Sequence, residues 1–276
     1  MNATNADESV GFIGLGALGT PIAQNLLASG VRLTVWNRTA SKAEPLSAKG
    51  ARVATEPKGA VPRGGVVFTI LWDDASLEEI VSADGFLDAL GPGGLHVSMT
   101  TVTPAMARKV AALHESRGSL YLEAPIFGIP AQAVARKLTV CLAGAAAAKE
   151  RARPLLTAMG AERTFDFGEA IGAATATKLA GNYLIVSSFA VMHEVFDALV
   201  ANGVDPKPTL EMLTTTLLAT PGNQRYAGYL LSGAPMPTSG IPAKDVGLFQ
   251  RFAAAGDSPS PVASEIGKAL AARASR

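Results

Sequence analysis

A lysine and an asparagine stand four residues apart at Lys178 and Asn182, inside a segment with a helical pattern. Residues at this spacing project from one helical face, one above the other. Their neighbours on the helix are apolar: Ala176, Leu179, Ala180 and Leu184. Partial burial there would lower the lysine pKa towards neutrality, which suits a general acid or base, and Asn182 could bind a substrate or orient the lysine. A surface lysine beside an amide is the alternative that the segment alone leaves open.

Three glycines near the start of the chain form a second pattern, Gly14-x-Gly16-x-x-Gly19. Apolar or helix-like runs surround them, at 10–13, 17–27 and 31–36. This strand–loop–helix–strand unit is typical of dinucleotide binding, in which the glycines allow a tight turn, backbone approach to a pyrophosphate and close packing of the helix. The backbone positions expected to contact the cofactor are Gly14, Leu15, Gly16, Ala17 and Leu18.

The end of the second apolar run indicates which dinucleotide binds. An NAD-selective site usually carries Asp or Glu there, which accepts hydrogen bonds from the ribose hydroxyls. This chain has Asn37, Arg38 and Thr39 instead. A guanidinium and a hydroxyl suit a 2′-phosphate, whereas a carboxylate would repel it. The sequence therefore predicts NADP(H), bound in part by these three residues; a solvated turn with a chance arginine is the alternative.

Composition narrows the class of protein. The chain has 276 residues, of which 48% are hydrophobic and 17% charged, so much of its surface is apolar or small and fits burial against a partner subunit. The net charge of +1 gives no reason to expect nucleic acid or an anionic membrane as a partner. No signal-peptide order opens the chain, and the apolar stretch 183–192 is too short for a membrane span. We expect a cytoplasmic enzyme.

Cysteine and histidine give no sign of a metal site. Cys141 is the one cysteine, which excludes an internal disulfide, and its apolar surroundings predict a buried strand residue. The histidines, His96, His114 and His193, lack ligand spacing, so no metal is predicted.

Apolar runs and helical patterns alternate up to about residue 168, and only helical patterns follow. The expected strands are 10–13, 33–36, 66–71, 95–99, 120–123, 138–142 and 164–167, and the expected helices between them are 17–27, 77–81, 104–115 and 149–159. The later helices are 170–202, 207–218, 224–231, 243–255 and 260–272. We therefore expect an α/β fold: a Rossmann-type, doubly wound parallel sheet in residues 1–168, joined by a long helix to an all-helical domain in residues 169–276. That helix would be about 50 Å long and buried all round.

Five segments, in order along nearly the whole chain, resemble the β-hydroxyacid dehydrogenase family, which includes 3-hydroxyisobutyrate dehydrogenase and glyoxylate/succinic semialdehyde reductases. They are the glycine loop Gly11–Gly19, Ser98-Met-Thr100-Thr101-Val-Thr-Pro104, Glu123-Ala-Pro-Ile-Phe127-Gly128-Ile129, Gly172 through Lys178 to Asn182, and Lys244-Asp245. The resemblance implies an oxidoreductase that transfers hydride between NADPH and a small aldehyde or ketone, such as a semialdehyde or an oxoacid, and that forms a homodimer or a tetramer.

The resemblance also implies roles for single residues. Lys178 would exchange a proton with the carbonyl or alcohol oxygen, and Asn182 would help to hold the substrate. Thr100 would lie near the nicotinamide, and Lys244 would close over the cofactor or substrate. The remaining implied contacts are Phe127 and Gly128 for the substrate and Leu71 and Trp72 for the cofactor.

Two departures from the family pattern bear on the substrate. Phe127 and Ile129 replace a serine and a glycine that offer hydrogen bonds to a substrate carboxylate, so the substrate is expected to be larger or less polar than a small hydroxyacid. Ser98 and Glu123 replace aspartates, which is a milder change.

Two other functions fit parts of the pattern. An imine reductase would explain the apolar loop and Asn37-Arg38-Thr39, but the ammonium of Lys178 would repel a protonated imine. A non-catalytic NADP-binding module would be expected to lack the catalytic lysine, which this chain has.

Overall fold

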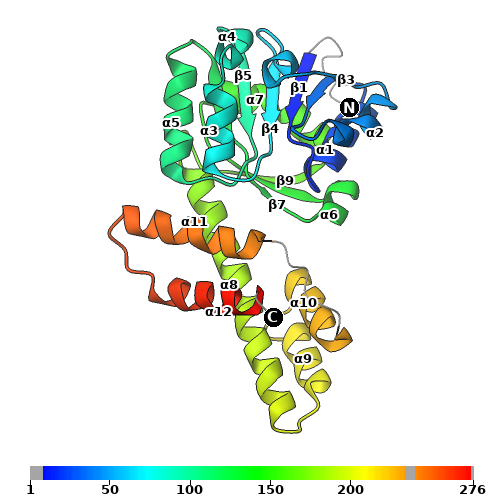
Figure 1. Ribbon diagram of the computed structural model, residues 1–276, viewed down its shortest axis with the longest axis vertical. Helices are drawn as coiled ribbons and strands as arrows, with labels where there is room; N and C mark the ends of the chain where they lie inside the picture. Colours follow the sequence, from blue (N-terminus) through cyan, green and yellow to red (C-terminus); the bar gives the residue numbers. More distant parts are fainter. Residues whose placement is uncertain (1–8, 234–239, 275–276) are drawn as a thin grey trace. The chain divides into compact units, whose positions relative to one another are not determined.

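The computed structural model describes residues 9–233 and 240–274, and it divides the chain into two compact units, Met1–Lys178 and Leu179–Arg276 (Figure 1). The units are separated later in the chain than the predicted domain boundary between residues 168 and 169, which stays a prediction.

The first unit is built on a six-stranded sheet in the order β3-β2-β1-β4-β5-β6, with every pair parallel. Its strands are β1 (Ser9–Ile13), β2 (Arg32–Trp36), β3 (Arg52–Val53), β4 (Val66–Thr69), β5 (Leu95–Ser98) and β6 (Leu120–Glu123). The strand order reverses between β1 and β4, and in such sheets ligands bind beyond the carboxyl ends of the strands at this reversal. The predicted α/β fold class is confirmed.

Helices cover both faces of this sheet (Figure 1). They are α1 (Gly19–Ala28), α3 (Asp74–Ser82), α4 (Phe86–Leu90), α5 (Pro104–Glu115) and α7 (Ala146–Met159), with the short helices η1 (Ala40–Ala43), α2 (Glu44–Ser47), η2 (Pro57–Ala60) and α6 (Pro130–Val134). Successive strand residues point to opposite faces, so Phe12 packs into the core on the side of α1 and α7, and Ile13 into the core of α3, α4 and α5. Both cores are apolar because both faces are covered.

The last strands of the unit form a separate sheet, which the sequence did not indicate. Here β8 (Leu138–Leu142) pairs antiparallel with β7 (Ile126–Phe127) and parallel with β9 (Ala161–Asp166). The break falls at Pro125, which lacks an N–H for a ladder; its carbonyl instead accepts from the Cys141 N–H at 3.0 Å. As predicted, Cys141 is a buried strand residue.

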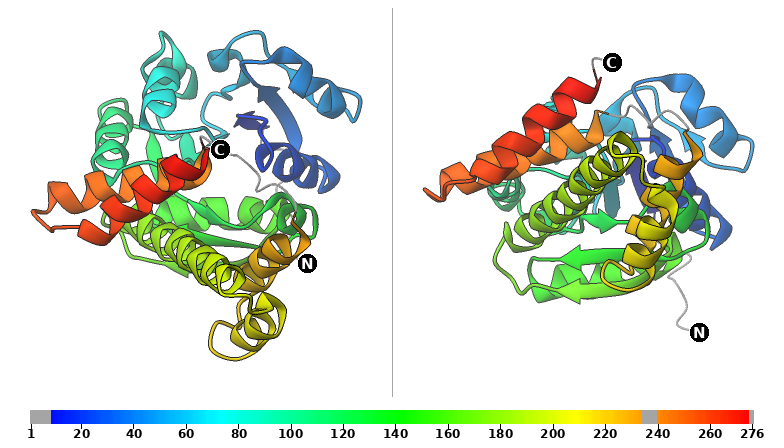
Figure 2. Two further views of the ribbon diagram at one scale, coloured as in Figure 1. Left: turned by 60° about the horizontal axis from the view of Figure 1, so that its bottom comes forward. Right: turned by 90° about the horizontal axis from the view of Figure 1, so that it is seen from below.

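The second unit contains only helices among its described residues. They are the larger part of α8 (Ala173–Ala201), and α9 (Pro206–Thr215), α10 (Pro221–Ser232), α11 (Ile241–Ala255) and α12 (Pro261–Ala274). One apolar cluster joins Val186 and Ala190 of α8 to α11 and α12, which lie side by side in Figure 2 (orange and red). A second cluster joins Met192 to α9 and α10. The all-helical character of this region is therefore confirmed.

The prediction that the long helix is buried all round is wrong within one chain. Leu184 of α8 is 68% exposed, Val191 52% and Val200 53%, because the two clusters cover only part of the helix circumference. The estimate that its apolar stretch is too short for a membrane span is also wrong, since α8 is long and apolar enough to cross one by length and composition alone, a test that core helices of soluble proteins also pass. The homodimer, which would cover these side chains, stays a prediction.

A chain of hydrogen bonds lies buried under α4 and α5. Thr69 Oγ1 lies 2.8 Å from His96 Nε2, His96 Nδ1 lies 2.9 Å from His114 Nε2, and His114 Nδ1 lies 2.9 Å from Ser119 Oγ. The Ser119 hydroxyl also donates to the His114 carbonyl oxygen at 3.1 Å. Burial, and then the neighbouring His114, holds the pKa of His96 well below its ordinary value, and burial lowers the pKa of His114 to about 4. Both rings are neutral in the folded protein at pH 7.

These histidines make the protein acid-sensitive. In the unfolded chain each one binds a proton below about pH 6.5, while in the folded protein it stays neutral until about pH 4 or lower. We expect the free energy of unfolding to be constant between about pH 7 and pH 8 and to fall below pH 6.5, approaching about 1.4 kcal/mol per pH unit for each histidine. Urea unfolding at pH 7.5, 6.5, 5.5 and 5.0 measures this slope. His193→Gln, at a less buried histidine, should keep it, and a flat profile down to pH 5 would contradict the assignment.

Candidate active site

The glycine loop connects β1 to α1 at the carboxyl edge of the sheet. Gly14 has a φ of +104°, and a Cβ there would lie 2.2 Å from the Ile70 carbonyl oxygen. A Cβ on Gly19 would lie 2.0 Å from the Gly14 carbonyl oxygen. In contrast, a Cβ on Gly16 would meet nothing within 4 Å. The protein's own packing thus requires Gly14 and Gly19, whereas Gly16 leaves the surface of the loop open to a ligand.

The start of α1 has the properties of an anion site. No side chain caps it, and its first turn contains no acidic residue. Backbone N–H groups at a helix N-terminus, together with the positive end of the helix dipole, favour a phosphate. The loop and the helix start therefore fit the pyrophosphate of a dinucleotide.

Asn37 supports this loop from the end of β2. Its Oδ1 accepts a hydrogen bond from the Leu15 N–H at 2.8 Å, and its Nδ2 donates to the Thr39 carbonyl oxygen at 3.0 Å. The amide side chain therefore braces the glycine loop, a role that its position in the sequence did not reveal. Arg38 and Thr39, the other two residues predicted to contact the cofactor here, are exposed.

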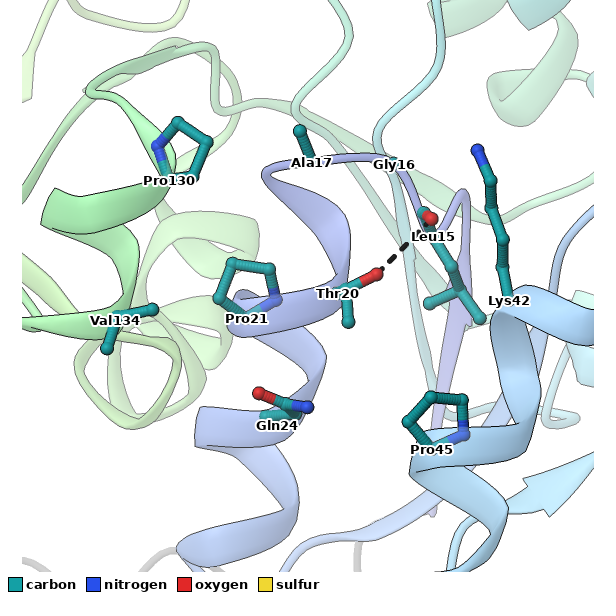
Figure 3. Close-up of a pocket in the computed structure, with 10 residues that line it drawn as sticks. All are labelled: Leu15, Gly16, Ala17, Thr20, Pro21, Gln24, Lys42, Pro45, Pro130 and Val134. Carbon is teal, nitrogen blue, oxygen red and sulfur yellow. Dashed lines mark hydrogen bonds between the residues drawn. The ribbon is translucent and has the colours of Figure 1, made fainter.

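A surface pocket of about 500 Å³ opens beside the loop (Figure 3). Its lining comes from three short segments of the first unit: Leu15, Gly16, Ala17, Thr20, Pro21 and Gln24; Lys42 and Pro45; and Pro130 and Val134. Thr20 Oγ1 donates to the Leu15 carbonyl oxygen at 3.2 Å. Figure 3 shows the Lys42 side chain extending beside the loop from η1. Lys42 is not among the predicted site residues; its place four residues after Arg38 is the only signal in the sequence that could have indicated it.

Thr100 links the carboxyl ends of two further strands. It is 2% exposed, and its Oγ1 accepts from the Leu71 N–H at 2.9 Å, which ties the segment after β5 to the segment after β4. Trp72, the next residue, is 51% exposed. Thr100, Leu71 and Trp72 thus lie at the carboxyl edge of the sheet, where a ligand of this fold would bind.

Lys178 is buried, as predicted, at the end of the first unit, with 7% of its surface exposed. Its Nζ lies 4.0 Å from the centroid of the Phe127 ring, a cation–π contact. The same ring packs on a cluster formed by Cys141, Ala143 and Ala174. Burial raises the pKa of the Cys141 thiol, and the charge of Lys178 opposes that rise. The ammonium group therefore lies buried against an aromatic ring that packs on an apolar cluster.

The loop beside Phe127 offers a substrate carboxylate fewer hydrogen-bond donors than the serine and glycine of the family pattern would. A Cβ on Gly128 would lie 2.5 Å from Leu138 Cδ2, so packing requires a small residue there. The Ile129 N–H donates to Gln132 Oε1 at 3.1 Å. This backbone donor is thus engaged within the protein.

In the second unit, Asn182 and Lys244 both contact Asp245. Asn182 Nδ2 donates to Asp245 Oδ2 at 2.7 Å, although 63 residues separate them. Lys244 Nζ lies 3.0 Å from Asp245 Oδ1. The structure thus brings two predicted site residues together through Asp245, which is 5% exposed and was not predicted as a site residue.

Comparison with known proteins identifies the family. Residues 9–168 match the family model described as the NAD binding domain of 6-phosphogluconate dehydrogenase. An NAD-dependent L-serine dehydrogenase of Pseudomonas aeruginosa is 34% identical over 274 residues, covering 93% of this chain and 89% of that protein. The chain belongs to the β-hydroxyacid dehydrogenase family. It is therefore an oxidoreductase with a nicotinamide cofactor.

Two solved structures resemble this β-hydroxyacid dehydrogenase over most of its length. One is Mycobacterium tuberculosis 3-hydroxyisobutyrate dehydrogenase with L-serine, with a TM-score of 0.83 at 26% identity, covering 97% of this chain and 94% of that one. The other is Psf3 in complex with NADP+ and 2-OPP, with a TM-score of 0.84 at 27% identity, covering 95% and 93%.

Proposed function

We propose that this β-hydroxyacid dehydrogenase uses NADP(H) and interconverts a small aldehyde or ketone with its alcohol, with Lys178 as the general acid and base. The observation that supports this most directly is the ammonium group of Lys178, buried and held against the Phe127 ring. A buried lysine without a role in catalysis would destabilise the folded protein at this position, because its charge must be desolvated, whereas an apolar residue would pack there without that cost.

The chemistry assigned to the chain's own residues is a proton transfer. NADPH, when bound, supplies the hydride. In reduction, Lys178 Nζ donates a proton to the carbonyl oxygen, and in the reverse direction it accepts one from the alcohol. Its positive charge also stabilises the negative charge that grows on this oxygen, and exclusion of water strengthens that interaction. The further roles proposed from the family resemblance are substrate binding by Asn182, nicotinamide contact by Thr100 and closure by Lys244.

Lys178→Ala tests this assignment directly. We expect NADPH-dependent reduction of a panel of semialdehydes, glyoxylate and simple aldehydes to fall by about 10²–10⁴-fold in kcat, since the variant lacks the proton donor. The affinity for NADPH, measured by fluorescence titration, should change little. Lys149→Ala removes a buried lysine that pairs with Asp166 at 2.8 Å, and it serves as the control for general loss of packing.

The same panel includes cyclic imines. Turnover of imines that survives Lys178→Ala would favour an imine reductase, for which the apolar ring of Phe127 is suited. Absence of turnover with every compound would favour a non-catalytic NADP-binding module.

The proposed preference for NADP(H) depends on the segment after β2. No carboxylate stands at the end of this strand, and the guanidinium of Arg38 lies close in sequence to the pocket cation Lys42. Two cations suit a 2′-phosphate. The complex of Psf3 with NADP+ supports this choice, while the relative from P. aeruginosa is named as NAD-dependent, so the preference is proposed from this chain's own residues.

Arg38→Ala should weaken NADPH binding by about 10–100-fold and leave NADH binding nearly unchanged, because a charge-assisted hydrogen bond contributes about 1.5–3 kcal/mol. Lys42→Ala should have a smaller effect of the same kind. Dissociation constants for both cofactors measure it. Arg32→Ala, which removes the same charge at the opposite end of β2, is the control. Equal losses for the two cofactors would refute the 2′-phosphate contact.

The substrate proposed for this site is a carbonyl compound with an apolar substituent. The Phe127 ring offers no hydrogen bond, and the Ile129 N–H already donates to Gln132. A substrate carboxylate would therefore find no free hydrogen-bond donor at these two positions. The free energy that its desolvation costs would not be compensated there.

Phe127→Ser should raise kcat/KM for glyoxylate and succinic semialdehyde relative to an aldehyde of similar size without a carboxylate, because the hydroxyl adds a donor. Phe127→Leu keeps an apolar side chain and should not shift this ratio. Steady-state kinetics on the paired substrates measures it. An unchanged ratio in Phe127→Ser would mean that this loop does not face the substrate.

A further inference from the structure

A buried carboxylate holds the start of the helix that carries Lys178. Glu123, the last residue of β6, is 1% exposed. Its Oε2 accepts from the Gly172 N–H at 2.7 Å, and its Oε1 accepts from the Thr175 N–H at 3.3 Å and from the Thr175 hydroxyl. Gly172 directly precedes α8, and Thr175 lies in its first turn. One side chain thus satisfies three donors at one helix end.

The carboxylate matches what this helix end requires. The first N–H groups of a helix have no partner within the helix, and the positive end of the dipole favours a negative charge. Burial raises the pKa of Glu123, and the hydrogen bonds from Thr175 and Gly172 oppose that rise. The turn at Gly172 is tightly packed as well: its φ is +105°, and a Cβ there would lie 2.7 Å from Arg108 Nη1 and 3.1 Å from Pro104 Cβ.

The segment that begins at Glu123 contacts the helix a second time. Four residues further on, the Phe127 ring lies 4.0 Å from Lys178 Nζ. Lys178 follows Thr175 by three residues, so the two side chains lie on adjacent turns of the same helical face. A rotation or slide of the first turn of α8 would therefore move the ammonium group away from the ring. The Glu123 carboxylate thus holds the first turn of α8, and the Phe127 ring contacts the Lys178 ammonium group.

We propose that Glu123 is a positioning residue for Lys178: by binding Gly172 and Thr175, it sets the rotation and axial position of the first turn of α8, and so the place of the ammonium group. This rests on the proposed function of Lys178. Glu123 itself is inaccessible to substrate, so its effect passes through the helix. The length of the side chain matters, since aspartate is one methylene shorter.

The test compares Glu123→Gln with the exposed control Glu162→Gln. In Glu123→Gln a neutral amide with one acceptor oxygen replaces the carboxylate. We therefore expect kcat for the best aldehyde of the panel to fall by about 10–100-fold, and the KM for NADPH to change less than twofold. Thr175→Val, which keeps the side-chain shape but removes one donor, should lower kcat by a smaller factor. Glu123→Asp should restore part of the lost activity if the charge is what the helix needs. These two variants keep the proposal testable if Glu123→Gln does not fold.

The double variant Glu123→Gln/Lys178→Ala separates positioning from general stability. If Glu123 acts through Lys178, the double variant has the same kcat as Lys178→Ala alone. A merely structural role would lower activity in both backgrounds and would weaken NADPH binding as well. Wild-type kcat in Glu123→Gln, or a loss that adds to that of Lys178→Ala, would overturn the proposal.

Hydrogen–deuterium exchange of the protein without cofactor gives a readout apart from activity. Amides at residues 172–178 should exchange at least tenfold faster in Glu123→Gln than in wild type, while those of α1 stay unchanged. Unchanged exchange at 172–178 would overturn the proposal. If Lys178→Ala retains full activity while exchange at 172–178 responds as expected, the general acid is misassigned but the carboxylate still anchors the helix.

Discussion

The rest of the proposed chemistry depends on keeping one ammonium group out of water. Lys178 is almost fully buried, and an ammonium group in such a place needs compensation for its lost hydration. The Phe127 ring face provides part of it, at 4.0 Å from Nζ. The separation of the strands after Pro125 into a second sheet is what places this ring beside the helix, since Phe127 belongs to β7 rather than to the main parallel sheet.

Much of the fold followed from local pattern. The strands at 120–123 and 138–142 and the helix at 104–115 have the bounds that the apolar runs and the Thr103-Pro104 start predict. Two features did not follow. The two-residue strand β7 is too short to show a period, and its pairing with β8 is a long-range contact. The exposure of α8 could not be predicted from its apolar content. Apolar content indicates that a helix face is buried in the functional protein, but not whether the same chain or a partner subunit buries it.

The candidate site divides in the same way. The tight packing at Gly14 and Gly19 and the burial of Lys178 could be predicted, because they follow from residue type at a fixed local spacing; no larger residue fits at either glycine. The long-range hydrogen bonds of the neighbouring residues could not be predicted. Asn37 reaches Leu15 across 22 positions, Asp245 reaches Asn182 across 63, and Glu123 reaches Thr175 across 52. Such hydrogen bonds depend on the strand order and the helix path, which no local spacing encodes.

The buried histidines show how the hydrogen bond at one end of a network decides the position of every proton in it. Because the Ser119 hydroxyl donates to the backbone carbonyl of His114, its oxygen is left to accept, and His114 Nδ1 must carry the hydrogen. His114 Nε2 is then an acceptor, which assigns the hydrogen of His96 to Nδ1 as well, and Thr69 donates to the remaining nitrogen. Both rings are therefore confined to a single tautomer, and the whole array has one direction, from threonine to serine. Reversing any link would require every other link to reverse with it.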